Sequence, residues 1–163
     1  MKKLFGFLLV LAVLGALKLL PFRATDAAKL LPVKTVIVTR SGEEYIVDIG
    51  AGVRAVGRTL SEALERLREE VTGEVFLPTA EQVVITEPIT DAVEAVAEEN
   101  AFRPAAGIYR TPLPAPDADA VSAYLASHSS NTTVLDVRAD LAAGREPRIP
   151  RLLAVDGGWR VDE

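Results

Sequence analysis

The sequence predicts an α/β or α+β fold in which a small mixed β-sheet is covered by about four helices. Short β-branched or alternating segments, typical of strands, interleave with segments whose apolar residues recur at helical spacing. Strand–turn–strand patterns stand near both ends of the domain, which favours a mixed sheet over an all-parallel one. The 163-residue chain then divides into a leader at residues 1–22, a tether at 23–32 and one domain at 33–163.

The domain opens with a predicted hairpin. Residues 33–40, VKTVIVTR, are rich in β-branched side chains, and Ser41-Gly42 is a turn signal. Residues 44–49 alternate between apolar and polar types and form the second strand. Glycines punctuate residues 50–57, which either extend this strand through a bulge or form a loop.

The clearest helix signal begins at Thr59. Thr59 and Glu62 have the spacing of a capping box, in which each side chain satisfies a backbone N–H of the first turn. Glu62 and Arg66 stand four residues apart, as an exposed ion pair on a helix requires. Gly73 ends the helix. Its apolar residues recur on one face: Leu60, Ala63, Leu64, Leu67 and Val71.

Residues 75–77 and 82–85 read as strand pieces on either side of a break at Pro78-Thr79. Pro88 opens a second helix, and residues 104–111 are a further strand. The buried side of this helix is predicted to carry Ile89, Ala92, Val93 and Val96.

Prolines at 112, 114 and 116 then exclude regular structure. Asp117 caps a third helix, and Thr133 with Asp136 begins a fourth that Gly144 closes. Residues 152–155 and 159–161 flank Asp156-Gly157-Gly158, which predicts a closing hairpin with Trp159 as its core anchor.

The leader has the pattern of an export signal. Lys2 and Lys3 precede an uncharged apolar run at residues 4–17, and the apolar span extends to Phe22 with Lys18 near its end. We interpret it as an uncleaved signal-anchor, because residues 24–28 offer a poor small-residue cleavage site and the span approaches the roughly 20 residues that cross a bilayer. The alternative is a cleaved signal peptide and a secreted domain. In both cases the domain is expected on the extracytoplasmic side.

Composition excludes several functional classes. The net charge of −5 argues against a nucleic-acid-binding protein. The chain has no Cys, which removes disulfides, thiolate nucleophiles and the lipid attachment site of a bacterial lipoprotein. We therefore expect packing alone to stabilise the domain.

Two motifs have the form of a binding or catalytic site, but their surroundings in the sequence favour structural roles. Residues 50–55 match a loose dinucleotide fingerprint, but the helix that should receive the pyrophosphate begins only at Thr59. His128 is the sole histidine and lies among serines, yet the chain lacks G-x-S-x-G, so we expect a polar loop there. A hydrolase that uses His128 with a neighbouring serine remains the competing function.

Acidic pairs are also expected to be structural. Each pair lies at a helix end or on a polar helix face, where acids are stabilised, and none has calcium-loop spacing. Asn131 begins a formal glycosylation sequon. We predict no catalytic residue, cofactor site or metal site. The acidic pairs with these structural roles are Asp117/Asp119, Glu98/Glu99 and Asp136/Asp140.

Two segments resemble a known family. Residues 57–67, GRTLSEALERL, with the apolar strands at 75–77 and 82–85, are similar to the N-terminal domain of the spore germination receptor C-subunit family. Residues 141–144 and 148–152 resemble a later segment of the same family. This resemblance implies an extracytoplasmic, membrane-tethered, non-enzymatic accessory subunit with an integral membrane partner. Family members are anchored through a lipidated Cys, which this chain lacks, and Pro78-Thr79 replaces their Gly-His.

The sequence therefore predicts a membrane-anchored extracytoplasmic binding or accessory protein, linked to sporulation or spore germination. Its expected contacts are the membrane, through the leader, and a membrane-protein partner, with no nucleic acid. An exposed sheet edge or the proline-rich segment at residues 112–116 is the expected interaction surface.

Overall fold

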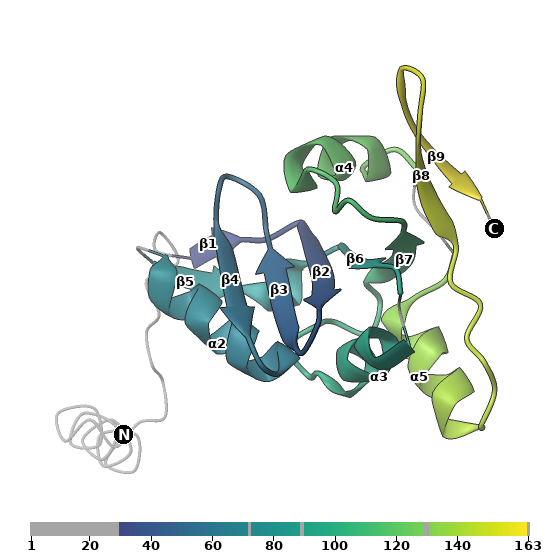
Figure 1. Ribbon diagram of the computed structural model, residues 1–163, viewed down its shortest axis with the longest axis horizontal. Coiled ribbons are helices and arrows are strands. Elements are labelled where there is room, and N and C mark those ends of the chain that lie inside the picture. Colours follow the sequence, from purple (N-terminus) through teal and green to yellow (C-terminus); the bar gives the residue numbers. More distant parts are fainter. Residues whose placement is uncertain (1–29, 72, 89, 129–130, 163) are drawn as a thin grey trace, which may run out of the picture.

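The computed structural model describes residues 30–71, 73–88, 90–128 and 131–162. Its main sheet has the strand order β4-β3-β2-β6-β7-β8-β9, with β2, β6, β7 and β8 parallel to one another. Antiparallel neighbours complete the two edges, which confirms a mixed sheet (Figure 1). The strands are β2 (Thr35–Ser41), β3 (Glu44–Asp48), β4 (Arg54–Gly57), β6 (Gln82–Thr86), β7 (Gly107–Thr111), β8 (Arg151–Val155) and β9 (Gly158–Asp162).

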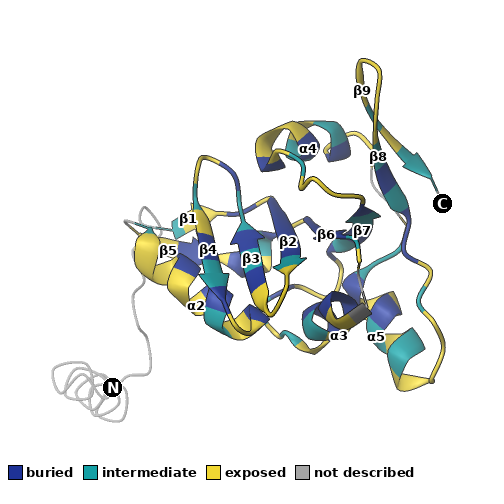
Figure 2. Ribbon diagram, viewed as in Figure 1, coloured by how far each residue is buried: buried dark blue, intermediate teal, exposed yellow. Residues whose placement is uncertain are grey.

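Helices cover both faces of this sheet. In the described residues α2 (Leu60–Glu70), α3 (Thr90–Glu98) and α5 (Val134–Ala142) pack on one face, and α4 (Ala118–Leu125) packs on the other. Successive side chains of a strand point to opposite faces of the sheet. In β2, Val36 and Val38 therefore pack in the core under α2, α3 and α5, whereas Ile37 packs in the core under α4. Figure 2 shows buried residues concentrated where strands face helices. The predicted α/β class with about four helices is confirmed.

The predicted leader helix lies outside the described residues. In the described part of the chain, no helix has both the length and the apolar character that a membrane span requires.

The glycine-rich segment contains an additional strand. Residues 50–52 form a tight turn in which Ala51 has a φ of 51° and Val53 N–H donates to the carbonyl of Gly50 at 2.9 Å. The chain then returns as β4, antiparallel to β3. Three glycines obscured the alternation, so the sequence indicated only a bulge or a loop.

A small second sheet stands beside the main one. β1 (Leu30–Pro32) pairs in parallel with β5 (Glu74–Phe76), and a 3-10 turn, η2 (Leu77–Thr79), follows at the predicted Pro78-Thr79 break. The sequence predicts residues 30–32 as the end of the tether. They are instead the first strand that the structure describes.

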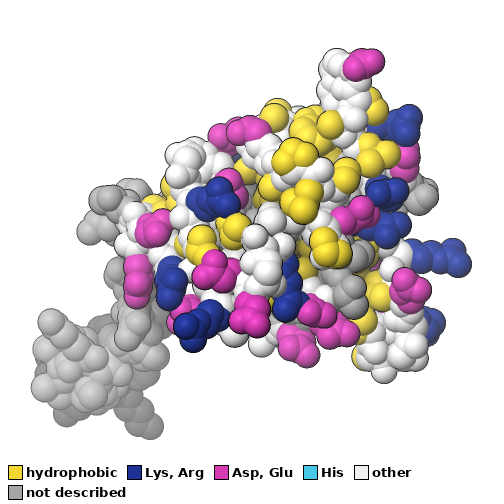
Figure 3. Space-filling view, viewed as in Figure 1, with side chains coloured by type: hydrophobic (Ala, Val, Ile, Leu, Met, Phe, Trp, Pro, Cys, Tyr) yellow, Lys and Arg dark blue, Asp and Glu magenta, His cyan; other side chains and the backbone are white. Residues whose placement is uncertain are grey.

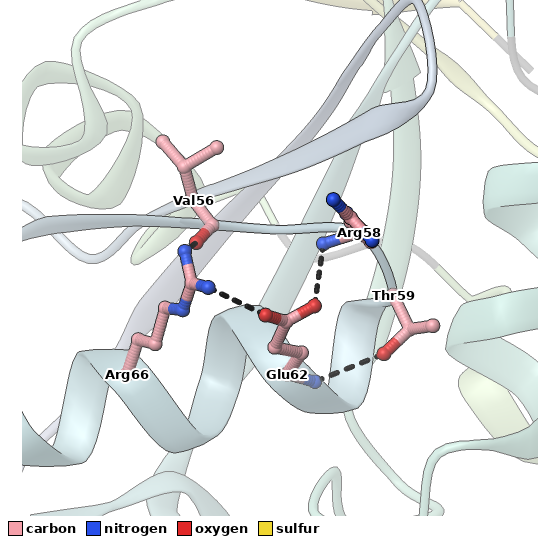
Figure 4. A network of polar contacts seen from close by, with 5 residues as sticks. All are labelled: Val56, Arg58, Thr59, Glu62 and Arg66. Carbon is pink, nitrogen blue, oxygen red and sulfur yellow. Dashed lines mark hydrogen bonds and ion pairs between the residues drawn. The ribbon is translucent and has the colours of Figure 1, made fainter.

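A polar network fixes the start of α2 (Figure 4). Thr59 Oγ1 accepts the N–H of Glu62 at 3.1 Å, as expected for the cap. The Glu62 carboxylate accepts the N–H of Arg58 at 2.8 Å, one residue earlier than the reciprocal bond that the sequence predicts. Arg66 donates to Glu62 at 2.6 Å and to the carbonyl of Val56 at 2.8 Å, so it joins the helix to β4.

Replacing Gly57 with Ala should lower the free energy of unfolding by about 1–3 kcal/mol, the usual cost of overpacking. A Cβ at this position would lie 2.4 Å from the backbone nitrogen of Ala63, so α2 would have to move off β4. Urea denaturation measures the change. Gly158→Ala is the matched control, because a Cβ there meets nothing within 4 Å. Equal stability of the two variants would contradict this packing.

Glu62 should make stability depend on pH. The N–H of Arg58 lowers the pKa of Glu62 from 4.5, burial opposes this, and the charge of Arg66 lowers it further. Because the folded pKa lies below the unfolded one, the stabilisation is present above pH 4.5 and is lost as the pH falls through the folded value.

The comparison of the chain with Glu62→Gln by denaturation at several pH values tests this. The stability difference should be greatest near neutral pH and shrink in acid. Glu65→Gln on the same helix controls for the loss of one charge. A difference that stays constant with pH would rule out the proposed role of the Glu62 carboxylate.

Candidate functional site

On the side of β7 that faces away from β6, two different segments of the chain accept its backbone hydrogen bonds. Ile108 N–H donates to the carbonyl of Thr132 at 3.1 Å, whereas Arg110 N–H donates to the carbonyl of Pro150 at 2.9 Å. Arg110 and Arg151 are the registered pair between β7 and β8. The segment that leads into α5 and the segment that leads into β8 therefore diverge at this edge. We call this place the β7 fork.

Local sequence explains why the two segments diverge. Pro147 and Pro150 have no N–H to give to a sheet ladder, so regular pairing of β8 begins only at Arg151. On the other side, Thr133 N-caps α5 by accepting the N–H of Asp136 at 3.3 Å, while Asp136 accepts the N–H of Thr133 at 2.8 Å. This reciprocal capping box stands where the sequence predicts the start of a helix, and it turns the chain away from β7.

A groove of about 730 Å³ lies in the fork. This volume falls within the roughly 300–1,000 Å³ of small-molecule sites. The two diverging segments form its walls, and β7 contributes Arg110. The lining residues are Arg110, Asn131, Thr132, Glu146, Pro147, Arg148, Ile149 and Pro150.

One carboxylate serves two arginines beside this groove. Glu87, which follows β6, accepts from Arg151 at 3.0 Å, and its other oxygen is 4.0 Å from Nε of Arg110. The second distance is too long for a hydrogen bond. The Nε atoms of Arg110 and Arg151 are both buried, and neither has a hydrogen-bond partner in the described part of the chain. Arg110 therefore lacks a full complement of acceptors.

The groove has a surplus of positive charge in a chain whose net charge is −5. Arg148 is exposed on one wall, and no ion pair joins it to another residue within the described ranges. Glu146 lies on the same wall. Figure 3 shows Lys and Arg side chains along the side of the molecule where β8 and β9 lie. Because arginine stays charged, this groove offers N–H donors and positive charge rather than proton transfer.

His128 and Ser127 lie next to each other after α4. Nδ1 of His128 is 3.0 Å from Ser127 Oγ and 3.0 Å from the carbonyl of Tyr124, and the ring stacks on Tyr124 at 4.1 Å. A carbonyl can only accept, so this contact favours a proton on Nδ1. An Nδ1–H cannot take the proton of Ser127. The pair therefore closes the end of the helix and lacks the arrangement of a nucleophile and its base.

The loose dinucleotide motif lies in a strand–strand turn. Residues 50–52 connect β3 with β4, and the N–H of Ala51 donates to Asp119 at 3.0 Å. No helix begins at these glycines, so the phosphate-binding geometry of that motif is not built here.

The acidic residues that the sequence singled out make structural contacts. Asp117 caps α4 through the N–H of Ala120 at 2.8 Å, and Asp140 pairs with Arg145 at 2.7 Å. Glu99 accepts the hydroxyl of Ser61 at 2.7 Å. Across the described ranges, no three His, Cys, Asp or Glu side chains form a group that could hold a metal ion.

Sequence reasoning did not single out the arginines of the fork as a site. Arg148 and Arg151 are part of the sequence analysis only through the family resemblance, and Arg110 lies within a predicted strand. The available signal was an arginine on either side of Ile149-Pro150, directly before a strand. Asn131, noted as a sequon, lines the groove, and Trp159 packs at the edge of the α4 cluster.

No protein-family model matches the chain, and neither the curated proteins nor the solved structures contain a match to it. The chemistry of the β7 fork therefore rests on its own residues.

Neutral His128 should carry its proton on Nδ1, because the Tyr124 carbonyl accepts from that atom. Long-range ¹H–¹⁵N correlation spectra of the imidazole distinguish the two tautomers. Ser127→Ala should leave the Nδ1–H form in place, since the carbonyl contact remains. An Nε2–H tautomer in the chain, lost in Ser127→Ala, would show that Ser127 donates to the ring as a catalytic serine would.

Proposed function

We propose that this protein is a membrane-anchored, extracytoplasmic, non-enzymatic binding or accessory protein. The export-signal pattern of residues 1–22 supports the anchor. The structural observation that bears on the anchor is that β1, which begins at Leu30, pairs with β5 and so belongs to the folded domain. Only residues 23–29 separate the leader from this first strand, so an anchored domain would sit close to the bilayer.

Thr79 reinforces this attachment. Its hydroxyl oxygen accepts the N–H of Val33 at 3.1 Å and lies 2.6 Å from the carbonyl of Phe76 and 3.2 Å from that of Val33. Val33 is itself buried. A force transmitted through the leader would therefore act on hydrogen bonds of the domain before it reached the main sheet.

A binding role is supported by the chemistry of the β7 fork. Its arginines offer positively charged donors, which suit recognition of a ligand or partner. The family resemblance supports an accessory subunit beside an integral membrane protein, with sporulation or spore germination as its setting. The exposed proline-rich segment at residues 112–116 remains a proposed contact surface for that partner.

A hydrolase is the second candidate, because Ser127 Oγ and His128 Nδ1 lie 3.0 Å apart, although the contact of Nδ1 with the Tyr124 carbonyl opposes the tautomer that a catalytic base requires. His128→Ala separates the two functions. If the protein is an accessory subunit, this variant should retain the phenotype of the parent chain. Loss of that phenotype, with an intact fold, would favour the hydrolase.

Fractionation of cells that express the chain at native level tests the anchor. Uncleaved protein should resist carbonate extraction, and external protease should digest the domain. Val13→Arg places a charge in the middle of the apolar span and should remove the chain from the membrane fraction, whereas Val13→Leu should not. A soluble product that begins after residue 22 would contradict the anchor.

The partner is tested in the same cells. A membrane protein should co-purify with the chain from mild detergent. Repeated recovery of the chain alone would contradict the accessory role.

A further inference from the structure

At the β7 fork, the guanidinium of Arg110 has a hydrogen-bond donor with no acceptor among the described residues. Buried polar atoms in proteins almost always have a hydrogen-bond partner, so a buried donor without one needs an explanation. Nε of Arg110 is such a donor. Glu87 cannot supply the missing acceptor in this geometry, because its nearer contact is to Arg151 at 3.0 Å and its other oxygen is 4.0 Å from Arg110.

We propose that the β7 fork groove binds an oxyanion, the carboxylate or phosphate group of a small solute. Arg110 and Arg148 come from different segments and line the same groove. Each guanidinium presents several N–H donors in a planar fork that matches two oxygens of a carboxylate or phosphate. A ligand bound between them would accept from Arg148 and from the N–H groups of Arg110 that stay accessible, since the Arg110 side chain is 39% exposed although its Nε is buried toward Glu87.

The other lining residues fit this class of ligand. Asn131 offers a neutral amide, and Pro147 and Pro150 form a stiff wall without N–H groups. Two arginines face one glutamate in the lining, so the groove keeps a net positive charge while Glu146 limits its strength. Recognition therefore depends on arginine side chains, which makes it testable by single substitutions.

The position of the groove favours a dissolved ligand over a lipid headgroup. β1, where the chain arrives from the leader, and β8, beside the groove, lie on opposite sides of the molecule in Figure 1. If the leader is anchored, the groove is turned away from the bilayer. The preference for a dissolved ligand over a lipid headgroup rests on the proposed function, whereas the proposal that the groove binds an oxyanion does not.

The test is a titration of the full chain in phosphatidylcholine nanodiscs, followed by the Nε–Hε resonances of its arginines. Inorganic phosphate and succinate are added at constant ionic strength, with chloride as the reference. We expect saturable shifts with at least one of the two probes and none with chloride.

The variants should change affinity in opposite directions. Arg148→Gln should weaken binding by about tenfold or more, since it removes a charge-assisted contact. Glu87→Gln should strengthen binding, because it removes a carboxylate that competes for Arg110. Arg68→Gln, on the exposed surface of α2, is the matched control for loss of one positive charge and should leave affinity unchanged. Arg148 is exposed, so its variant should fold even if Glu87→Gln does not.

Three results would overturn the proposal. Shifts that do not saturate would exclude a defined site. Equal effects of Arg148→Gln and Arg68→Gln would show general screening instead of binding in the groove. Shifts caused by phosphatidylglycerol nanodiscs without phosphate would replace the solute with a lipid headgroup. Failure of the anchor would appear in fractionation and not in this titration, so the two proposals fail separately.

Discussion

The outer edge of β7 is the constraint on which the C-terminal half of the structure depends. Its N–H groups are divided between Thr132 and Pro150, so two segments must leave the same strand in different directions. The closing hairpin β8–β9 consequently joins the sheet through the single registered pair Arg110–Arg151. Apolar packing secures the rest of that hairpin, since Leu152 is buried against the cluster under α4. The groove and the arginines within it follow from this division.

The opposite half of the sheet is held by closer packing. Gly57 brings β4 against the backbone of α2, and the network around Glu62 and Arg66 joins the same two elements. Backbone contact and a filled core leave little freedom there. We therefore assign support of the fold, and attachment to the leader through β1, to this half. We propose ligand recognition for the other half, where prolines interrupt pairing and, among the described residues, the buried Nε atoms of Arg110 and Arg151 have no hydrogen-bond partner.

Local sequence patterns were sufficient to predict the helix caps and the closing hairpin turn. The caps at Thr59, Asp117 and Thr133 and the hairpin turn near Gly157 were all predicted, because each depends on a few adjacent residues. β4 was missed because glycines interrupted its alternation. The β7 fork was missed for a different reason: Glu87, Arg110 and Arg151 are distant in sequence and meet only through the order of parallel strands. Neither the hydrophobic periodicity of a segment nor the spacing of a short motif predicts contacts between residues so far apart in the sequence.

A crystal structure of the chain grown with inorganic phosphate tests the central claim most directly, which is that divergence at β7 builds a groove for an oxyanion. The account predicts a phosphate between the guanidinium groups of Arg110 and Arg148, with Arg110 N–H still bonded to the carbonyl of Pro150. The contrary result would be a closed fork, in which the segment before β8 runs along β7 and Arg110 Nε is bonded to a protein acceptor.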